Sequence, residues 1–159
     1  MEPSLVMFDE ELKGISEIIE RLLRDSNAKS VYLVDKDGQL IASSGDTRDI
    51  DSTSLASLTA GNIAATGGLA KLIGEKEFSI LFHEGEKDNI HISIVGQRMI
   101  LVVIFDDRSS LGLVRLRVRK AGEELHGCVQ KILKRAEASK TKESLLEEIT
   151  DEDIESLFH

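Results

Sequence analysis

Apolar side chains recur at helical spacing near the start of the chain. Between residues 9 and 25 they follow steps of three and four residues: Leu12, Ile15, Ile19, Leu22 and Leu23. Charged residues fill the positions between them, so the apolar side chains form one stripe along a helix. The pattern predicts an amphipathic helix over residues 9–25 that packs on a core through this stripe.

A hairpin signal follows this helix. Two β-prone runs, residues 31–36 and 39–43, flank the pair Asp37-Gly38. An Asp-Gly pair suits a two-residue turn in which both residues take positive φ. The polar residues 44–52 then predict a loop, and either Asp51 or Ser52 could cap the next helix.

The remaining elements alternate between helical and strand patterns. We expect a helix over residues 53–73 and strands near residues 78–83, 90–95 and 99–105. Residues 110–135 are ambiguous, because Val114, Leu116 and Val118 alternate with arginines as in a strand. The helical spacing continues for much longer, through Leu125 and Val129, and it favours a helix. Short turns between strands predict an α+β fold (mixed α/β), with about five strands in a mostly antiparallel sheet covered by helices.

The C-terminal region changes in composition. We expect one domain over residues 5–135, a polar linker over 136–149 and a short helical motif over 150–159. Ile154, Leu157 and Phe158 would share one face of that last helix. A helix so short is marginally stable alone and requires a surface to dock on.

The helix predicted for residues 53–73 lacks the usual charged outer face. A helical projection places Leu55, Leu58, Ala65, Leu69, Leu72 and Ile73 on a core side. The opposite side then carries Ala56, Ala60, Ala64, Gly67 and Gly68, with Lys71 as its single charge. Small side chains allow another backbone to come close, so this side predicts a partner surface and a homodimer. The alternative is a helix buried on both sides within one domain.

Composition narrows the class of function. The formal net charge of −9 disfavours general nucleic-acid binding. The basic run Arg115, Arg117, Arg119 and Lys120 is an exception that suits either a solvated helix start or an acidic partner. A single cysteine, Cys128, fits a reducing compartment. No apolar run is long enough to span a membrane and Met1-Glu2-Pro3 does not resemble a secretory signal, so we expect a cytoplasmic protein without membrane insertion.

The usual catalytic motifs are missing from the sequence. It contains no Gly-x-x-x-x-Gly-Lys-Ser/Thr loop and no Gly-x-Gly-x-x-Gly fingerprint. His83, His91, His126 and His159 lack metal-ligand spacing, and a strand histidine such as His91 is more often a sheet residue than a ligand. We therefore expect no catalytic residues, metal or cofactor, and a regulator rather than an enzyme.

Several segments resemble one family. Residues 34–43 (VDKDGQLIAS), 53–65 (TSLASLTAGNIAA), 82–85 (FHEG), 101–106 (LVVIFD), 110–116 (SLGLVRL) and 148–158 (EITDEDIESLF) are similar to the MglB branch of the Roadblock/dynein light chain superfamily. The resemblance implies the Roadblock fold, with a five-stranded mostly antiparallel sheet, one helix on one face and two on the other. It also implies a homodimer in which the sheet edge near residues 78–83 meets its symmetry mate.

The same resemblance implies a function. Members of this branch are GTPase-activating proteins for a small Ras-like GTPase of the MglA type in bacterial cell polarity and motility. Carried onto this chain, the GTPase would contact Ala60, Ala64, Gly67, Gly68 and Lys71, and a second contact would involve Ile154, Leu157 and Phe158.

The predicted platform helix contains no arginine, so an arginine finger from this surface is not expected. Arg108, Arg115, Arg117 and Arg119 remain alternatives only if they reach the nucleotide. The other possible function is a non-catalytic scaffold or adaptor of the Roadblock type, which composition does not distinguish from an activator.

Overall fold

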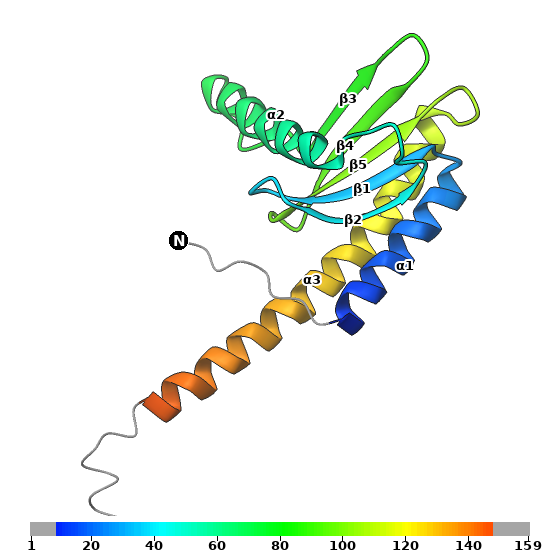
Figure 1. The fold of residues 1–159 in the computed structure, drawn as a ribbon. Helices are drawn as coiled ribbons and strands as arrows, with labels where there is room; N and C mark the ends of the chain where they lie inside the picture. Colours follow the sequence, from blue (N-terminus) through cyan, green and yellow to red (C-terminus); the bar gives the residue numbers. More distant parts are fainter. Residues whose placement is uncertain (1–8, 148–159) are drawn as a thin grey trace, which may run out of the picture.

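The computed structural model describes residues 9–147 as a sheet layered between helices (Figure 1). Three helices and five strands follow one another along this range: α1 (Asp9–Ser26), β1 (Ser30–Asp35), β2 (Leu40–Gly45), α2 (Ser52–Leu72), β3 (Ile80–Glu84), β4 (Asn89–Val95), β5 (Met99–Phe105) and α3 (Leu111–Glu147). The helices and strands predicted from the sequence within this range are confirmed. The third strand begins at Ile80, two residues later than predicted.

All neighbouring strands of the sheet are antiparallel, and their order is β2-β1-β5-β4-β3. The predicted hairpin joins β1 to β2 around Asp37 and Gly38. Only Gly38 takes positive φ (91°), so the prediction that both residues of the pair would do so is wrong for Asp37. Gly96 and Gln97, both at positive φ, make the tight turn between β4 and β5. This order leaves β2 and β3 at the two edges of the sheet.

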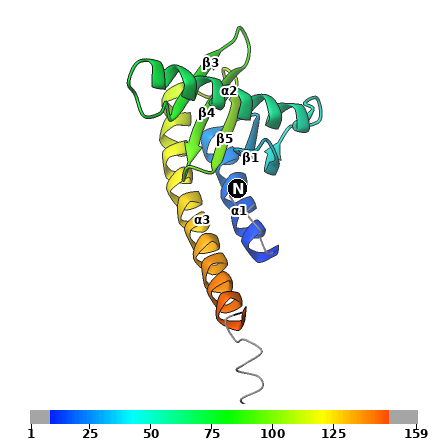
Figure 2. The ribbon, with the colours of Figure 1, turned by 90° about the vertical axis from the view of Figure 1, so that its left-hand side faces the viewer.

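The central strand β5 is buried along its whole length, which matches its unbroken apolar sequence. On one face of the sheet, β5 and β1 pack against the apolar stripes of α1 and α3, including Ile15, Ile19 and Leu125. On the other face, a smaller core forms around Tyr32, Ile100 and Val102 together with Ala56 of α2. Two helices therefore cover one face and a single helix covers the other, as Figure 2 shows from the side and as predicted.

Coverage of the sheet by α2 is incomplete. The helix packs mainly against β1 and β2 at one end of the sheet. The side chains of β3 are mostly exposed on both faces. Two surfaces at the β3 end of the sheet are consequently less covered than the rest.

Helix α3 is longer than predicted. The sequence analysis ended it at Arg135, but it continues to Glu147, so residues 136–147 of the predicted linker are helical. The polar segment from 136 to 147 contains no Gly or Pro and is rich in Ala, Glu, Lys and Leu, which are strong helix formers. Figure 1 shows this part of α3 running past the end of α1 and away from the sheet.

We predict that a chain ending at Arg135 remains folded. Residues 136–142 are exposed, so their removal takes away little buried surface. The free energy of unfolding should change by less than about 1 kcal/mol. Thermal or denaturant unfolding of the two chain lengths measures this.

A chain ending at Cys128 is the matched control. It also loses Val129 and Ile132, which are buried in the core between α1, α3 and the sheet. This truncation should destabilise the protein by more than about 3 kcal/mol. Equal stability of the Arg135 and Cys128 truncations would contradict the boundary that we assign to the core.

Candidate partner-binding surface

Asp51 fixes the beginning of α2. Its carboxylate accepts hydrogen bonds from the Ser54 backbone N–H (3.2 Å) and the Ser54 hydroxyl (2.9 Å). Both bonds hold the pKa of Asp51 below its ordinary value, and the bond from the Ser54 hydroxyl has the larger effect. The cap satisfies a helix N–H that would otherwise lack a partner, and it sets where the helix leaves the loop.

The face that α2 presents to the sheet differs from the predicted one. Its buried side chains are Ala56, Thr59 and Ala70. The prediction that placed Ala56 on the outer side was wrong. The assignment of Leu58, Ala65, Leu69, Leu72 and Ile73 to the core was also wrong, because all five are exposed and only Leu55 is partly buried.

The close packing of α2 explains this inversion. Ala56 and Thr59 are small, so the helix axis can lie close to the sheet and to the β1–β2 turn. A Cβ atom added at Gly38 would lie 3.7 Å from the Cβ of Ala60 and 3.5 Å from the Cα of Ser57. Small residues on this side therefore serve the fold, while the larger leucines face outward.

Three of the five helix positions predicted to face a partner are exposed. Ala64, Gly68 and Lys71 lie at successive turns of one exposed stripe, whereas Ala60 and Gly67 are partly buried. A Cβ atom added at Gly67 or Gly68 would meet nothing within 4 Å. Space for an approaching backbone is thus present along this stripe.

Exposed leucines enlarge the surface beyond what the sequence indicated. Leu58 is 75% exposed and Leu72 is 82% exposed, so both add to the exposed side of α2. Lys71 is the one charged residue between Ser52 and Leu72. The exposed side of α2 is therefore largely uncharged, which is unusual for a helix side in contact with water.

The edge strand β3 lies beside this helix surface. It pairs only with β4, so its outer edge is unpaired within the described chain. Leu81 and His83 of β3 are on the α2 face of the sheet. Ile80 (48% exposed) and Phe82 (37% exposed) pair with Ser93 and His91 of β4, so they lie along the same edge but on the α3 face. Asn62 Nδ2 of α2 lies 3.1 Å from His83 Nε2 of β3, which ties the helix to the strand. We call α2 and β3 together the α2–β3 surface.

A groove of about 670 Å³ separates the first half of α2 from the sheet. Leu55 and Leu58 line its helix side, and Ile90 and Ile92 of β4 line its floor. The groove exists because α2 covers β1 and β2 but leaves the β4 face partly open. An apolar side chain from a partner could enter here.

The arginines considered as possible fingers lie elsewhere. Arg108 follows β5, and its Nε lies 3.1 Å from Asp106 Oδ1. Arg115, Arg117 and Arg119 lie on α3, which covers the opposite face of the sheet from α2. Within the described residues, none of these four arginines is on the α2–β3 surface.

Three other predictions concern metal sites, the C-terminal residues 150–159 and membrane-spanning helices. Among the described residues, no group of three or more His, Cys, Asp or Glu side chains could hold a metal ion. Ile154, Leu157 and Phe158, predicted as a second contact, lie outside the described residues. No helix in residues 9–147 is both long and apolar enough to cross a membrane.

His91 is a buried histidine within β4. It is 1% exposed, and burial together with the positive charge of Arg115 lowers the pKa of its imidazole below 6.5. The ring therefore favours the neutral form in the folded protein. It is a sheet residue, as expected, and it lies on the α3 face of the sheet, opposite α2 and next to Phe82 of β3.

Comparison with known proteins identifies the family to which this fold belongs. A family model of the Roadblock/LC7 domain matches residues 14–105, the range from α1 to the end of β5. This sheet, with one helix on one face and two on the other, is the Roadblock fold. A search of curated protein sequences found no match.

Similar solved structures show which branch of this family the chain belongs to. Myxococcus xanthus MglB is 61% identical, with a TM-score of 0.77 over 80% of this chain and 96% of that chain. The gliding protein MglB of Thermus thermophilus is 34% identical, with a TM-score of 0.77 over 82% of this chain and 99% of that chain. A further MglB, described with a tetrameric arrangement, is 32% identical, with a TM-score of 0.77 over 83% of this chain and 99% of that chain. The chain therefore belongs to the MglB branch of the Roadblock/LC7 family.

The buried imidazole of His91 predicts a pH dependence of stability. Because its folded pKa lies below 6.5, the unfolded chain binds a proton first as the pH falls. Stability is therefore fully present above pH 6.5 and declines as the pH falls from there toward the folded pKa. The decline has a limiting slope of about 1.4 kcal/mol per pH unit.

The measurement is denaturant unfolding of the wild type and of His91→Gln at pH 7.5 and pH 5. Glutamine does not titrate, so the wild type should lose more stability than the variant between the two pH values. The difference between the proteins isolates His91 from the other titrating groups. Equal losses in the two proteins would contradict the lowered pKa.

Proposed function

We propose that this protein is a GTPase-activating regulator of a small Ras-like GTPase of the MglA type, acting in the cytoplasm as a homodimer in bacterial cell polarity. One observation carries the proposal: the largely uncharged, exposed side of α2 lies beside the unpaired apolar edge of β3. Exposure of such a surface to water costs free energy, and a partner removes it from water. Membership of the MglB branch supports this choice of partner.

The β3 edge supports a symmetric dimer. An exposed strand edge offers unpaired N–H and C=O groups to another strand. If two copies pair through β3, the sheet continues across the two-fold axis and each copy contributes the same surface. The two α2 helices would then lie on the same side of the joined sheet and form one platform.

The proposed mechanism works without an arginine finger. GTP hydrolysis depends on an aligned water molecule and on stabilisation of charge at the transferring phosphoryl group. The segment Ser52–Leu72 has no arginine, and the arginines of α3 are on the other side of the sheet. The protein would therefore act by binding the conformation in which the residues of the GTPase are themselves aligned, which requires tighter binding to the GTP state.

We predict a dimer of twice the 17.5 kDa chain mass in solution. Ile80→Lys should weaken it, because it places a charge on the strand edge that pairing of two β3 strands would remove from water. Leu40→Lys is the matched control, since Leu40 is an exposed apolar residue on β2, the other edge of the sheet. Light scattering over a dilution series measures both variants. A wild-type monomer at micromolar concentration, or equal weakening by the two variants, contradicts the β3 dimer.

The platform is tested by Ala64→Arg combined with Gly68→Arg. Both side chains are added on the exposed stripe of α2, so the fold should survive. Two desolvated, unpaired charges at the contact should weaken GTPase binding by several kcal/mol, or at least about a hundredfold. The measurements are the thermal melt, the binding of the GTPase in its GTP-like and GDP states, and the rate of GTP turnover.

Gly127→Arg combined with Gln130→Arg is the control for charge. It adds the same two charges at exposed positions of α3, on the opposite face of the sheet. This variant should stimulate turnover as the wild type does. Stimulation that persists in the α2 variant would place the GTPase elsewhere. Binding without stimulation by the wild-type protein, with equal affinity for both nucleotide states, would instead favour a scaffold.

A further inference from the structure

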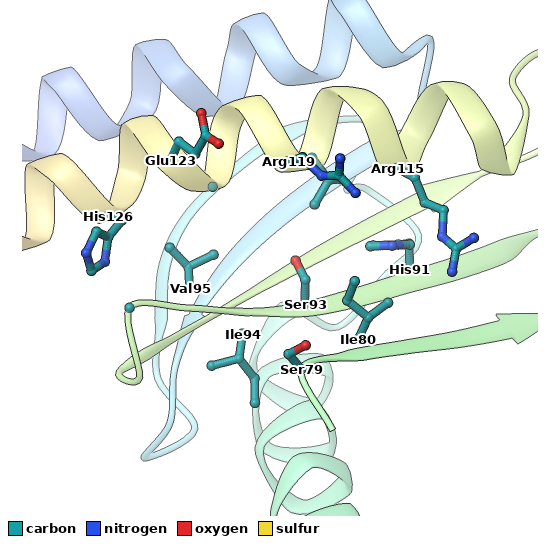
Figure 3. A pocket seen from close by; sticks show the side chains of 13 residues that line it. Ser79, Ile80, His91, Ser93, Ile94, Val95, Arg115, Arg119, Glu123 and His126 are labelled. Atoms are coloured by element: carbon teal, nitrogen blue, oxygen red, sulfur yellow. The ribbon is translucent and has the colours of Figure 1, made fainter. Parts of the chain in front are cut away.

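A second cavity lies on the sheet face opposite α2. It has a volume of about 580 Å³ and separates α3 from β3 and β4 (Figure 3). Volumes of this order are typical of sites for small organic ligands. Ile80 borders both this cavity and the proposed dimer edge, whereas the proposed GTPase contact on α2 lies on the other face of the sheet.

Buried polar groups line the floor of this cavity. His91 and Ser93 alternate along β4, so both side chains are on the α3 face, where they are 1% and 7% exposed. Neither ring nitrogen of His91 nor the hydroxyl of Ser93 has a hydrogen-bond partner among the described residues. Their cross-strand neighbours on β5, Val103 and Leu101, offer no polar side chain. Buried polar atoms are normally paired, so these three point to a polar ligand.

Two arginines reach toward the same floor from α3. Arg115 and Arg119 are one helical turn apart and both line the cavity. Figure 3 shows their side chains on either side of His91, with the Ser93 hydroxyl directed toward α3. Neither arginine forms a salt bridge within residues 9–142. A pair of guanidinium groups matches the geometry of a phosphate or a carboxylate.

The other basic residues of the run face a different neighbour. Arg117 and Lys120 lie between α3 and α1, near the acidic residues Asp25 and Glu124. Glu123 also borders the cavity, and Figure 3 shows its carboxylate directed away from β4. The positive charge over His91 is therefore supplied by Arg115 and Arg119. Apolar side chains, including Ile80 and Val118, complete the walls.

We propose that this cavity binds a small organic anion, whose phosphate or carboxylate group lies between Arg115 and Arg119. Ser93 and the N–H of the His91 imidazole donate hydrogen bonds to the anionic group or to a polar atom next to it. The apolar part of the ligand packs against Ile80 and Val118. The basic run of the sequence therefore serves two surfaces: Arg115 and Arg119 form this site, and Arg117 and Lys120 face α1.

The test uses the full-length protein and four probes. Phenyl phosphate and benzoate each combine an anionic head with an apolar ring, and they distinguish phosphate from carboxylate preference. Inorganic phosphate tests the head alone and phenol tests the ring alone. NMR titration of backbone amides and histidine side chains measures binding. At least one of the two combined probes should shift the signals of His91 and Ser93, and should bind more tightly than either part alone.

Matched variants locate the site. Arg115→Gln combined with Arg119→Gln should weaken binding of the preferred probe at least tenfold. Arg117→Gln combined with Lys120→Gln removes the same charge from the same helix and should leave binding within a factor of two. Ser93→Ala is a smaller change that should weaken binding severalfold without disturbing the fold, which the amide spectrum verifies.

Two results would overturn the proposal. One is the absence of saturable shifts at His91 and Ser93 with both combined probes at roughly 10 mM, which exceeds the millimolar dissociation constants of weak ligands. The other is equal loss of binding in the two double variants, which would show attraction to the overall charge of α3. Loss of binding in Ser93→Ala and in the Arg115/Arg119 variant, with retention in the Arg117/Lys120 variant, supports the site.

Discussion

The requirement that β5 be covered on both faces governs this structure. Seven consecutive apolar residues, Met99–Phe105, lie at the centre of the sheet and are all buried. A strand of this kind is stable only between two layers, and the chain supplies three helices for them. Two helices fill one face and a single helix, α2, lies on the other. The helices cover the β2–β1–β5 part of the sheet better than they cover β3.

The functional surfaces are found where this coverage ends. On the α2 face, the open part of β4 forms the floor of the groove beside α2, and the exposed leucines of α2 lie next to it. On the α3 face, the corresponding gap contains His91, Ser93 and the two arginines. The two faces differ in chemistry, because one is apolar and the other is polar and cationic. One weakly covered end of a sheet thus offers two sites of different kinds.

The sequence predicts most of the fold, because the patterns of its elements are strong. The stripe of α1 has helical spacing, and the apolar run of β5 is short and rich in Val and Ile, which favours a buried strand. Helix α2 is different, since apolar residues lie on all its sides and periodicity cannot show which side meets the sheet. The helical projection assigned the leucines to the core side, whereas Ala56 and Thr59 are the residues that pack closely on the sheet. The prediction that 136–149 is a linker failed for residues 136–147, because a solvent-exposed helix and a linker have the same polar composition.

Part of the candidate sites was accessible from the sequence. Ala64, Gly68 and Lys71 are exposed, as the helical projection predicted, although the leucines that it assigned to the core are exposed as well. The position of Arg115 and Arg119 over His91 could not be predicted, because it depends on how α3 crosses the strands. Such a contact joins residues distant in sequence, and no local pattern records it.

The extension of α3 determines how any segment attached to it can search for a binding site. Ile132 is the last buried residue of α3 up to residue 142, and the helix continues beyond it for roughly 15 residues, which is about 22 Å at 1.5 Å per residue. A random coil of that length would let its end sample a sphere around the domain. A helix instead holds its end at a fixed direction and distance from the domain. A segment attached at Glu147 would therefore have a high effective concentration only near that point. The length of α3 therefore acts as a ruler, and inserting or deleting residues in it would change both the reach and the rotational phase of the attached segment.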